Sequence, residues 1–319
     1  MALASEAGAD CNPPAAVSGE TVVWDWGQDW GDPTSIGPRL FPVQLPNLKG
    51  VVAIAVGNAH SLALKNDGTV WGWGFNIDGE LGDGTNADRL WDAPAQVLNL
   101  SGITAVAAGQ NHSLAIKNDR TVWAWGWNPR GALGDGTETD RNTPVQVINL
   151  SGAKAIAAGG YHSLALKSDG TVWAWGANDR GQLGDGTTIQ RPAPVPVPNL
   201  SGVAGIAGSA DADYTLALKG DGTVWAWGAN DAGQLGDGTT TDRHAPVRAK
   251  DLTAATAIAP HSRHTLAIKT IASPFDGVVE AWGNNQSGQL GDGEPNQPFI
   301  ARAGATCLPQ RGHGHRRGL

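Results

Sequence analysis

The chain has 319 residues, with 22 lysine and arginine against 30 aspartate and glutamate side chains, which leaves a formal charge of −8. This acidity argues against a nucleic-acid-binding surface, because such surfaces need a basic stripe that neutralises phosphate. The 45 glycines, 19 prolines and 14 tryptophans favour many turns, short strands and a repeated motif over long helices.

Residues 1–14 form a predicted N-terminal segment ahead of the repeats. The segment has neither a basic start nor an apolar stretch of signal-peptide length. No run in the chain approaches the ~20 apolar residues that span a bilayer. We therefore predict no membrane insertion.

A repeat of about 50 residues follows. The motif His-Ser-Leu-Ala-Leu-Lys at residues 60–65 returns, with small changes, at 112–117, 162–167, 214–219 and 264–269. A strand with tryptophans at alternate positions comes after each copy, at 69–74, 121–126, 171–176, 223–228 and, weakly, 278–283, with an extra early copy at 22–27. A fixed period of this length is typical of solenoids and propellers.

Within one unit, four short strands are predicted, at residues 152–158, 163–167, 171–175 and 193–197. Glycine-rich segments between them suit tight turns. Proline cannot donate a ladder hydrogen bond, so the fourth strand, with Pro194, should be the outer edge of its sheet. Alternate tryptophans share one face of their strand and should pack against a neighbouring sheet. The pattern predicts an all-β propeller of four-stranded antiparallel blades.

These motifs resemble the regulator-of-chromosome-condensation repeat, in a bacterial type. Its hallmarks are an Ala-Gly turn, His-Ser/Thr-Leu-Ala-Leu, an aromatic-x-Trp-Gly strand and Asn-x-x-Gly-Gln-Leu-Gly, and the last element occurs unchanged at residues 178–184 and 230–236. The resemblance covers residues 15–293 and implies a β-propeller, typically of seven blades.

Six Trp-Gly strands lead us to predict six blades, with a truncated seven-blade ring as the alternative. Strands at residues 15–17 and 300–304 would complete one composite blade and close the ring, as such rings are closed. We thus predict one propeller domain at residues 15–308 and a disordered tail at 309–319. The same alignment places Cys11 and Cys307 at this seam, which suggests a disulfide between them.

The repeated polar residues do not predict a metal or catalytic site. One histidine per blade cannot gather around an ion, and one aspartate per Leu-Gly-Asp-Gly-Thr loop lacks the oxygens that calcium needs. No phosphate loop, Gly-x-Ser-x-Gly elbow or His-Glu-x-x-His motif occurs. We predict no catalytic residues, no cofactor and no enzymatic activity.

Residues that break the repeat are the candidates for partner recognition, since identical positions cannot encode the choice of a partner. Four aromatic residues fall outside the strand register, and two of them, Phe75 and Trp127, stand where later blades have Ala177 and Ala229. Their alternative role is to fill gaps under loops. Four further candidates vary on the turns before the second strand. The full set is Trp30, Phe75, Trp91, Trp127, Tyr161, Asp211, Asp213 and Arg263.

We predict a monomeric, non-enzymatic scaffold that binds an unknown protein and no nucleic acid. The resembling family includes an exchange factor for a small GTPase, a plant ultraviolet-B photoreceptor and a secreted bacterial inhibitor of β-lactamase. An inhibitor of a hydrolase such as β-lactamase, an exchange-factor-like regulator and an enzyme with a site assembled across blades stay open as alternatives. Light sensing is disfavoured, because the turns at 57–61, 109–113 and 159–163 lack the photoreceptor's tryptophan. A secreted or surface location is expected, with a cytoplasmic one as the alternative.

Overall fold

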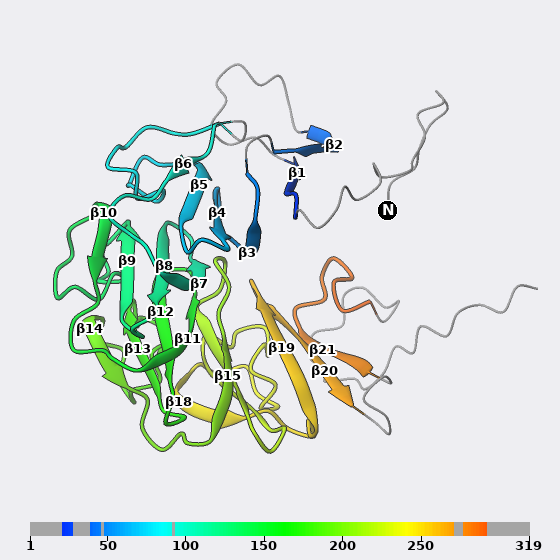
Figure 1. Cartoon of the computed structure of the whole chain (residues 1–319). Helices are drawn as coiled ribbons and strands as arrows, with labels where there is room; N and C mark the ends of the chain where they lie inside the picture. The colour runs from blue at the N-terminus through cyan, green and yellow to red at the C-terminus, as the bar shows by residue number, and fades with distance from the viewer. Residues whose placement is uncertain (1–20, 28–38, 46–47, 91–92, 271–276, 292–319) are drawn as a thin grey trace, which may run out of the picture.

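The computed structural model describes residues 21–27, 39–45, 48–90, 93–270 and 277–291. Within these ranges every regular element is a β-strand, and the sheets follow one another around a curved array (Figure 1). Four sheets have four strands, the last has three, and a two-stranded sheet precedes the first. The described part contains no helix long and apolar enough to cross a membrane. The prediction of all-β, four-stranded antiparallel blades is confirmed.

The strands are short and pair in chain order. The two-stranded sheet comprises β1 (Trp24–Gly27) and β2 (Arg39–Gln44). Blade 1 comprises β3 (Val51–Val56), β4 (His60–Lys65), β5 (Val70–Gly74) and β6 (Ala95–Gln96). Blade 2 comprises β7 (Ile103–Ala108), β8 (His112–Lys117), β9 (Val122–Gly126) and β10 (Arg141–Gln146). Blade 3 comprises β11 (Ala153–Ala158), β12 (His162–Lys167), β13 (Val172–Gly176) and β14 (Arg191–Pro196).

The last two blades follow the same plan. Blade 4 comprises β15 (Val203–Ala207), β16 (Tyr214–Lys219), β17 (Val224–Gly228) and β18 (Arg243–Arg248). Blade 5 comprises β19 (Ala255–His261), β20 (His264–Thr270) and β21 (Gly277–Gly283). In blade 3 the observed strands agree with the predicted ones to within two residues. Its proline-bearing β14 pairs only with β13, at the outer edge, as predicted.

The core lies between blades. Trp175 of blade 3 is fully buried in a cluster with Leu114 and Ile116 of blade 2, and Trp173 packs against the same cluster. Trp175 also donates a hydrogen bond from Nε1 to the carbonyl oxygen of Ala132 in blade 2, at 2.8 Å. Equivalent tryptophans repeat this arrangement in other blades. Each indole thus provides apolar burial together with a hydrogen bond across the blade boundary.

The predicted number of blades is wrong: the residues that the structure describes form five blades, and not six or seven. The early tryptophan strand does fold, as β1, but it pairs only with β2 and does not belong to a four-stranded blade. Consistently, Ile54 and Val56 of β3 are 60% and 65% exposed, whereas the equivalent Ile156 and Ala158 of blade 3 are half-buried and buried. No described four-stranded blade precedes β3 and packs against these side chains. The predicted closing strands at 15–17 and 300–304, and the predicted Cys11–Cys307 disulfide, lie outside the described residues.

Candidate functional site

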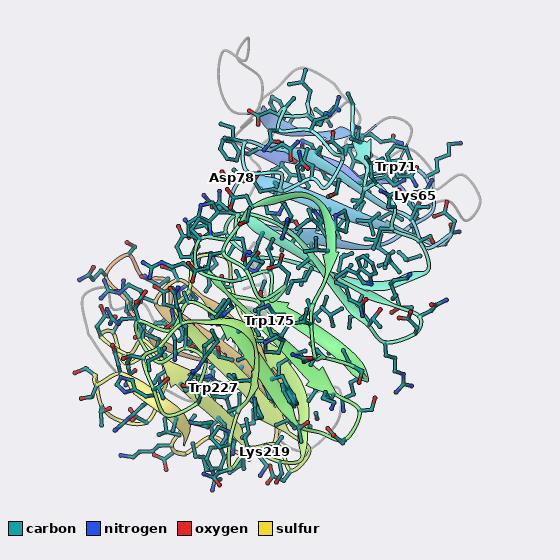
Figure 2. All side chains as sticks on the ribbon, turned by 90° about the vertical axis from the view of Figure 1, so that its left-hand side faces the viewer. Lys65, Trp71, Asp78, Trp175, Lys219 and Trp227 are labelled. Atoms are coloured by element: carbon teal, nitrogen blue, oxygen red, sulfur yellow. The ribbon has the colours of Figure 1, made fainter. Side chains whose placement is uncertain are left out.

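The propeller has two different faces. In each blade the turn between the first and second strands and the long loop after the third strand lie at one end, which we call the loop face. Side-chain positions show this in blade 1, where Asp78 lies at the loop face and Lys65 and Trp71 lie at the opposite end (Figure 2). Most of the repeat-breaking candidates belong to the loop face.

Backbone hydrogen bonds join the inner turns of successive blades. The amide of Asn58 donates to the carbonyl oxygen of Gln110 (3.4 Å), that of Gln110 to Gly160 (3.1 Å), and that of Gly160 to Ala212 (3.0 Å). These bonds run from blade 1 to blade 4 without using side chains. Side chains on the turns are therefore free to vary while their backbone positions stay fixed.

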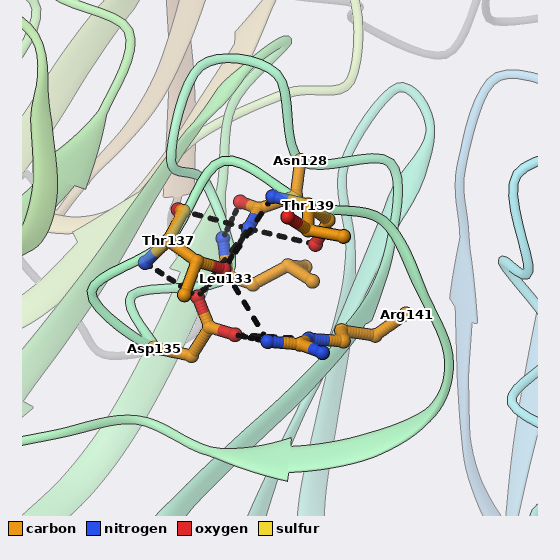
Figure 3. A network of polar contacts seen from close by, with 6 residues as sticks. All are labelled: Asn128, Leu133, Asp135, Thr137, Thr139 and Arg141. Atoms are coloured by element: carbon orange, nitrogen blue, oxygen red, sulfur yellow. Dashed lines mark hydrogen bonds and ion pairs between the residues drawn. The ribbon is translucent and has the colours of Figure 1, made fainter.

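A buried asparagine organises each long loop. The Nδ2 group of Asn128 donates to the carbonyl oxygens of Thr137 (3.0 Å) and Thr139 (3.1 Å), and its Oδ1 accepts from the Leu133 amide at 2.9 Å (Figure 3). Asp135 accepts from the Thr137 hydroxyl (2.7 Å) and pairs with Arg141 (2.9 Å). Although burial opposes ionisation, the hydrogen bonds from Thr137 and Arg141 lower the pKa of Asp135. The Asp-Gly-Thr loops therefore use their carboxylates to hold the loop.

Buried histidines connect neighbouring blades on this face. His60 Nε2 lies 3.0 Å from Ser113 Oγ, whose hydroxyl donates to the carbonyl oxygen of Glu80 (2.8 Å), so Nε2 must be the donor. His112 and His162 make the same contact, each at 2.9 Å, with the next blade. Burial lowers the pKa of His60 to about 4. The repeated histidines thus serve as uncharged links between blades.

One carboxyl group in the loop face is unusual. Glu80 is fully buried where blades 3 and 4 have Gln182 and Gln234. Its Oε2 accepts from the Asp78 amide (3.0 Å) and its Oε1 from Asn111 Nδ2 (3.1 Å). Burial raises the pKa of Glu80 to about 7, because these bonds do not replace the lost water.

Glu80→Gln is expected to stabilise the protein at pH 8. Because its folded pKa lies above the unfolded value, Glu80 contributes stability that is complete below pH ~4.5 and is lost as pH rises through about 7. A glutamine avoids the cost of a buried charge, so we expect a gain of about 1–2 kcal/mol at pH 8 and a much smaller change at pH 5. Urea unfolding at both pH values measures this. The exposed Glu138→Gln is the control, and an equal effect of Glu80→Gln at both pH values would contradict the explanation.

Two of the predicted aromatic residues meet on the loop face. Trp127 directly follows β9, and its amide donates to the carbonyl oxygen of Asn111 at 2.8 Å. Tyr161 lies on the turn between β11 and β12. Their ring centroids are 4.8 Å apart with planes tilted by 48°, and both side chains are half-buried. The pair spans the boundary between blades 2 and 3 and leaves part of both rings open to solvent.

Asp213 lies beside this pair. A β-carbon placed on Gly160 would be 3.4 Å from Asp213 Oδ1, so the carboxylate lies over the peptide that precedes Tyr161. Burial and the nearby Asp213 charge raise the pKa of Tyr161, and Arg130 partly opposes this. We name Trp127, Tyr161 and Asp213 the Tyr161 corner.

Arginine–aspartate pairs, which the sequence analysis did not find, surround the corner. Arg130 pairs with Asp179 at 2.9 Å. In the next blades Arg180 pairs with Asp242 at 2.6 Å, and the predicted Arg263 pairs with Asp231. Arg130 and Arg180 occupy the same position of the Asn-x-x-Gly loop in adjacent blades. This shared position was the signal that could have revealed them.

The remaining candidates are more scattered. Phe75 is half-buried, its amide donates to the Ala59 carbonyl oxygen (2.8 Å), and its ring contacts no other described aromatic ring. Asp211 lies 4.0 Å from His261 Nε2. Trp30 and Trp91 lie outside the described residues. The structure therefore brings together three of the eight predicted residues and leaves Phe75 apart from them.

The fold and its loop face define a tandem-repeat β-propeller. The chain belongs to the Regulator of chromosome condensation (RCC1) repeat family: one model of this repeat matches residues 67–116, 119–166, 169–218 and 221–268, and a second matches 51–80, 103–132 and 153–182. The predicted family is confirmed, and its bacterial type stays a prediction.

Similar proteins differ widely in length. The Ultraviolet-B receptor UVR8 of Arabidopsis thaliana is 35% identical over 310 residues, which are 93% of this chain and 69% of the receptor. The human probable E3 ubiquitin-protein ligase HERC3 is 36% identical over 260 residues, which are 80% of this chain but only 19% of HERC3.

Solved structures support the same fold. Human WBSCR16 has a TM-score of 0.73 at 22% identity, with 88% of this chain and 76% of that chain covered. Yeast RCC1 (Prp20), solved with Kap60, has a TM-score of 0.71 at 24% identity, with 88% and 71% covered. At these identities the likeness concerns the fold alone.

Proposed function

We propose that this chain is a non-enzymatic, protein-binding propeller that recognises its partner through the loop face around the Tyr161 corner. The observation that carries the proposal is the half-buried Trp127–Tyr161 pair, with centroids 4.8 Å apart, which no other blade repeats within the described residues. Aromatic side chains beside arginines are the residues that dominate protein interfaces.

The surroundings of the pair also favour protein binding. The turns and loops beneath it are fixed by backbone bonds and by buried asparagines. Ala177 and Ala229 take the place of Trp127 in the next two blades, and their amides make the equivalent bonds to Tyr161 and Asp213 (both 2.9 Å). The fold therefore does not need an indole at this position, which supports a role in recognition.

Relatives with this fold bind proteins. Yeast RCC1 is solved bound to Kap60, and yeast Prp20p has binding properties toward Gsp1p and histones. We extend to this chain the binding of a protein, without the identity of those partners. Light sensing is not proposed, since the turns lack the tryptophan of the photoreceptor motif. A secreted or surface location stays a prediction.

Trp127→Ala is expected to abolish retention of the partner without unfolding the protein. The test immobilises the full chain, captures proteins from lysate and medium of the source organism, and compares native protein, Trp127→Ala and the opposite-face variant Asn118→Ala. A protein retained by native and Asn118→Ala, and at least tenfold depleted with Trp127→Ala, supports the proposal. Equal retention by all three forms, or no retained protein, contradicts it. Urea unfolding verifies that Trp127→Ala retains native stability within about 1 kcal/mol.

A further inference from the structure

One carboxylate on the loop face differs from its neighbours. Asp179 pairs with Arg130 (2.9 Å), Asp242 with Arg180 (2.6 Å), and Asp231 with Arg263. Asp213 is exposed and, among the described residues, accepts no hydrogen bond and forms no ion pair through its side chain. Its charge is therefore left without a partner on a face where nearby carboxylates have one.

The position of this carboxylate is fixed. The Asp213 carbonyl oxygen accepts from the Ala229 amide (2.9 Å), and the preceding carbonyl, of Ala212, accepts from the Gly160 amide (3.0 Å). Gly160 has no side chain, so the carboxylate can lie close to its peptide, beside Tyr161. An aromatic ring and an unpaired anion thus stand side by side on a backbone that cannot easily move.

On the opposite face of the same chain, an aromatic ring and a carboxylate stand beside a lysine side chain. Lys65 Nζ lies 5.6 Å from the Trp71 ring centroid and 3.7 Å from Asp67 Oδ2. The next three blades repeat the lysine–tryptophan stacking at 5.4–5.6 Å. There, the blade itself supplies the cation that faces the indole. At the Tyr161 corner the ring and the carboxylate are present, but the blade supplies no such lysine.

We propose that the Tyr161 corner receives an arginine or lysine side chain from a basic segment of the partner protein. The cation would stack on the open part of the aromatic pair and form an ion pair with Asp213. This inference rests on the proposed function, because it names the chemistry of the partner at the same site. The net charge of −8 also favours a basic partner, whose approach it would speed.

Two arginines of the chain act on the corner: Arg180 acts on Asp213, and Arg130 acts on both Asp213 and Tyr161. Desolvation raises the pKa of both Tyr161 and Asp213, and the positive charge of Arg130 partly opposes this rise at each. However, its Nη1 is bonded to Asp179, so it repels an incoming cation without pairing with Asp213. Arg130→Gln should therefore strengthen the binding of a basic peptide. The same substitution would not strengthen that binding if the corner were specific for neutral or acidic peptides.

The test uses a fluorescein-labelled heptapeptide of alternating glycine and arginine, and the same peptide with uncharged citrulline for arginine. Fluorescence anisotropy at 50 mM salt gives both dissociation constants with the full-length protein. We expect at least tenfold tighter binding of the arginine peptide, about a tenfold loss with Asp213→Asn, and a gain with Arg130→Gln. Asp211→Asn is the matched control: it removes the same charge two residues away and should change the affinity less than threefold.

Several outcomes would overturn the inference. These are equal binding of the two peptides, equal losses with Asp213→Asn and Asp211→Asn, or no binding of the arginine peptide. If the protein self-associates and Asp213→Asn makes it monomeric, then a second copy, and not a basic partner, occupies the corner. Should Trp127→Ala abolish partner capture while the arginine peptide fails these criteria, the proposed function stands and only the cationic inference fails.

Discussion

Acidification from pH 7 to pH 5 is expected to remove a large part of the stability of this protein, because three histidines are buried without charge. Burial lowers the pKa of His60 and His162 to about 4 and that of His112 to about 3, against 6.5 in the unfolded chain. The Nδ1 atoms of His112 and His162 have no hydrogen-bond partner among the described residues. A proton added there would create a buried charge with nothing to stabilise it.

The sign of the effect follows from these pKa values. Between pH ~6.5 and pH ~4 these histidines bind protons in the unfolded chain but stay neutral in the folded chain. The stability that they contribute is therefore complete above pH ~6.5 and is lost as pH falls toward 4. At pH 5 each histidine costs about 2 kcal/mol, whereas a typical domain has only about 5–15 kcal/mol in total. Glu80 acts in the opposite direction, since its raised pKa makes the folded state gain a proton as pH falls through about 7. One carboxyl group offsets only part of the effect of three histidines.

Urea unfolding between pH 5 and pH 8 measures the proton uptake, which is the slope of unfolding free energy against pH. His162→Gln should reduce that slope by up to one proton near pH 5, whatever it does to stability at pH 7. Tyr214→His is the converse variant, because Tyr214 holds the same position in blade 4 and its hydroxyl lies 2.9 Å from Thr265 Oγ1. It should steepen the slope. A free energy of unfolding that is the same at pH 5 and pH 7 would contradict the assignment of neutral buried histidines.

The sequence predicted the blades well because each strand carries its own local signal. The alternating tryptophans, the proline in β14 and the glycine turns act within one unit of about 50 residues, and all were placed correctly. The number of blades depends instead on which incomplete copies of the repeat pair with enough other strands to form a blade. Trp24 and Trp26 match the motif as well as any later copy, yet their strand pairs only with β2, and no local feature of the motif distinguishes these two outcomes.

The candidate site, too, could be predicted from the sequence only in part. Departure from the repeat pointed to Tyr161 and Trp127, because a residue that differs between otherwise identical blades is visible in one sequence. The pairing of these rings, and of Arg130 with Asp179, joins residues about 34 and 49 positions apart across a blade boundary. Glu80 was missed for another reason: it replaces glutamine in a conforming motif, and only burial makes the substitution significant.

Close packing between residues also cannot be predicted from the repeat pattern. Gly159 stands in one of the glycine-rich turns, and a β-carbon there would lie 1.9 Å from His162 Cε1. The glycine is needed so that the histidine ring can lie against the turn and reach Thr215 of the next blade. The turn that carries Tyr161 and the link between blades 3 and 4 therefore depend on one another.

Asn128→Ala is expected to give the largest loss of stability of any single loop-face substitution, about 3–5 kcal/mol. The side chain is fully buried. Its removal leaves the Leu133 amide and the carbonyl oxygens of Thr137 and Thr139 without their partner. The bond to the Leu133 amide is buried, and an unsatisfied buried group costs about 1–3 kcal/mol. The bonds to the two carbonyl oxygens are partly buried, so water restores them only in part.

The urea midpoint of Asn128→Ala, measured at pH 7.5 beside native protein, tests this loss. Asn118→Ala is the matched control, because Asn118 is an exposed asparagine of the same blade on the opposite face, and it should change stability by less than about 0.5 kcal/mol. Asn128→Asp separates the bonds: it keeps an acceptor for the Leu133 amide but loses the Nδ2 donor and adds a charge near Asp135, so it should also be strongly destabilising. Equal midpoints for Asn128→Ala and Asn118→Ala would mean that the long loops are not held by their asparagines. Trp127, which directly precedes Asn128, would then lack the rigid support that the proposed recognition at the Tyr161 corner requires.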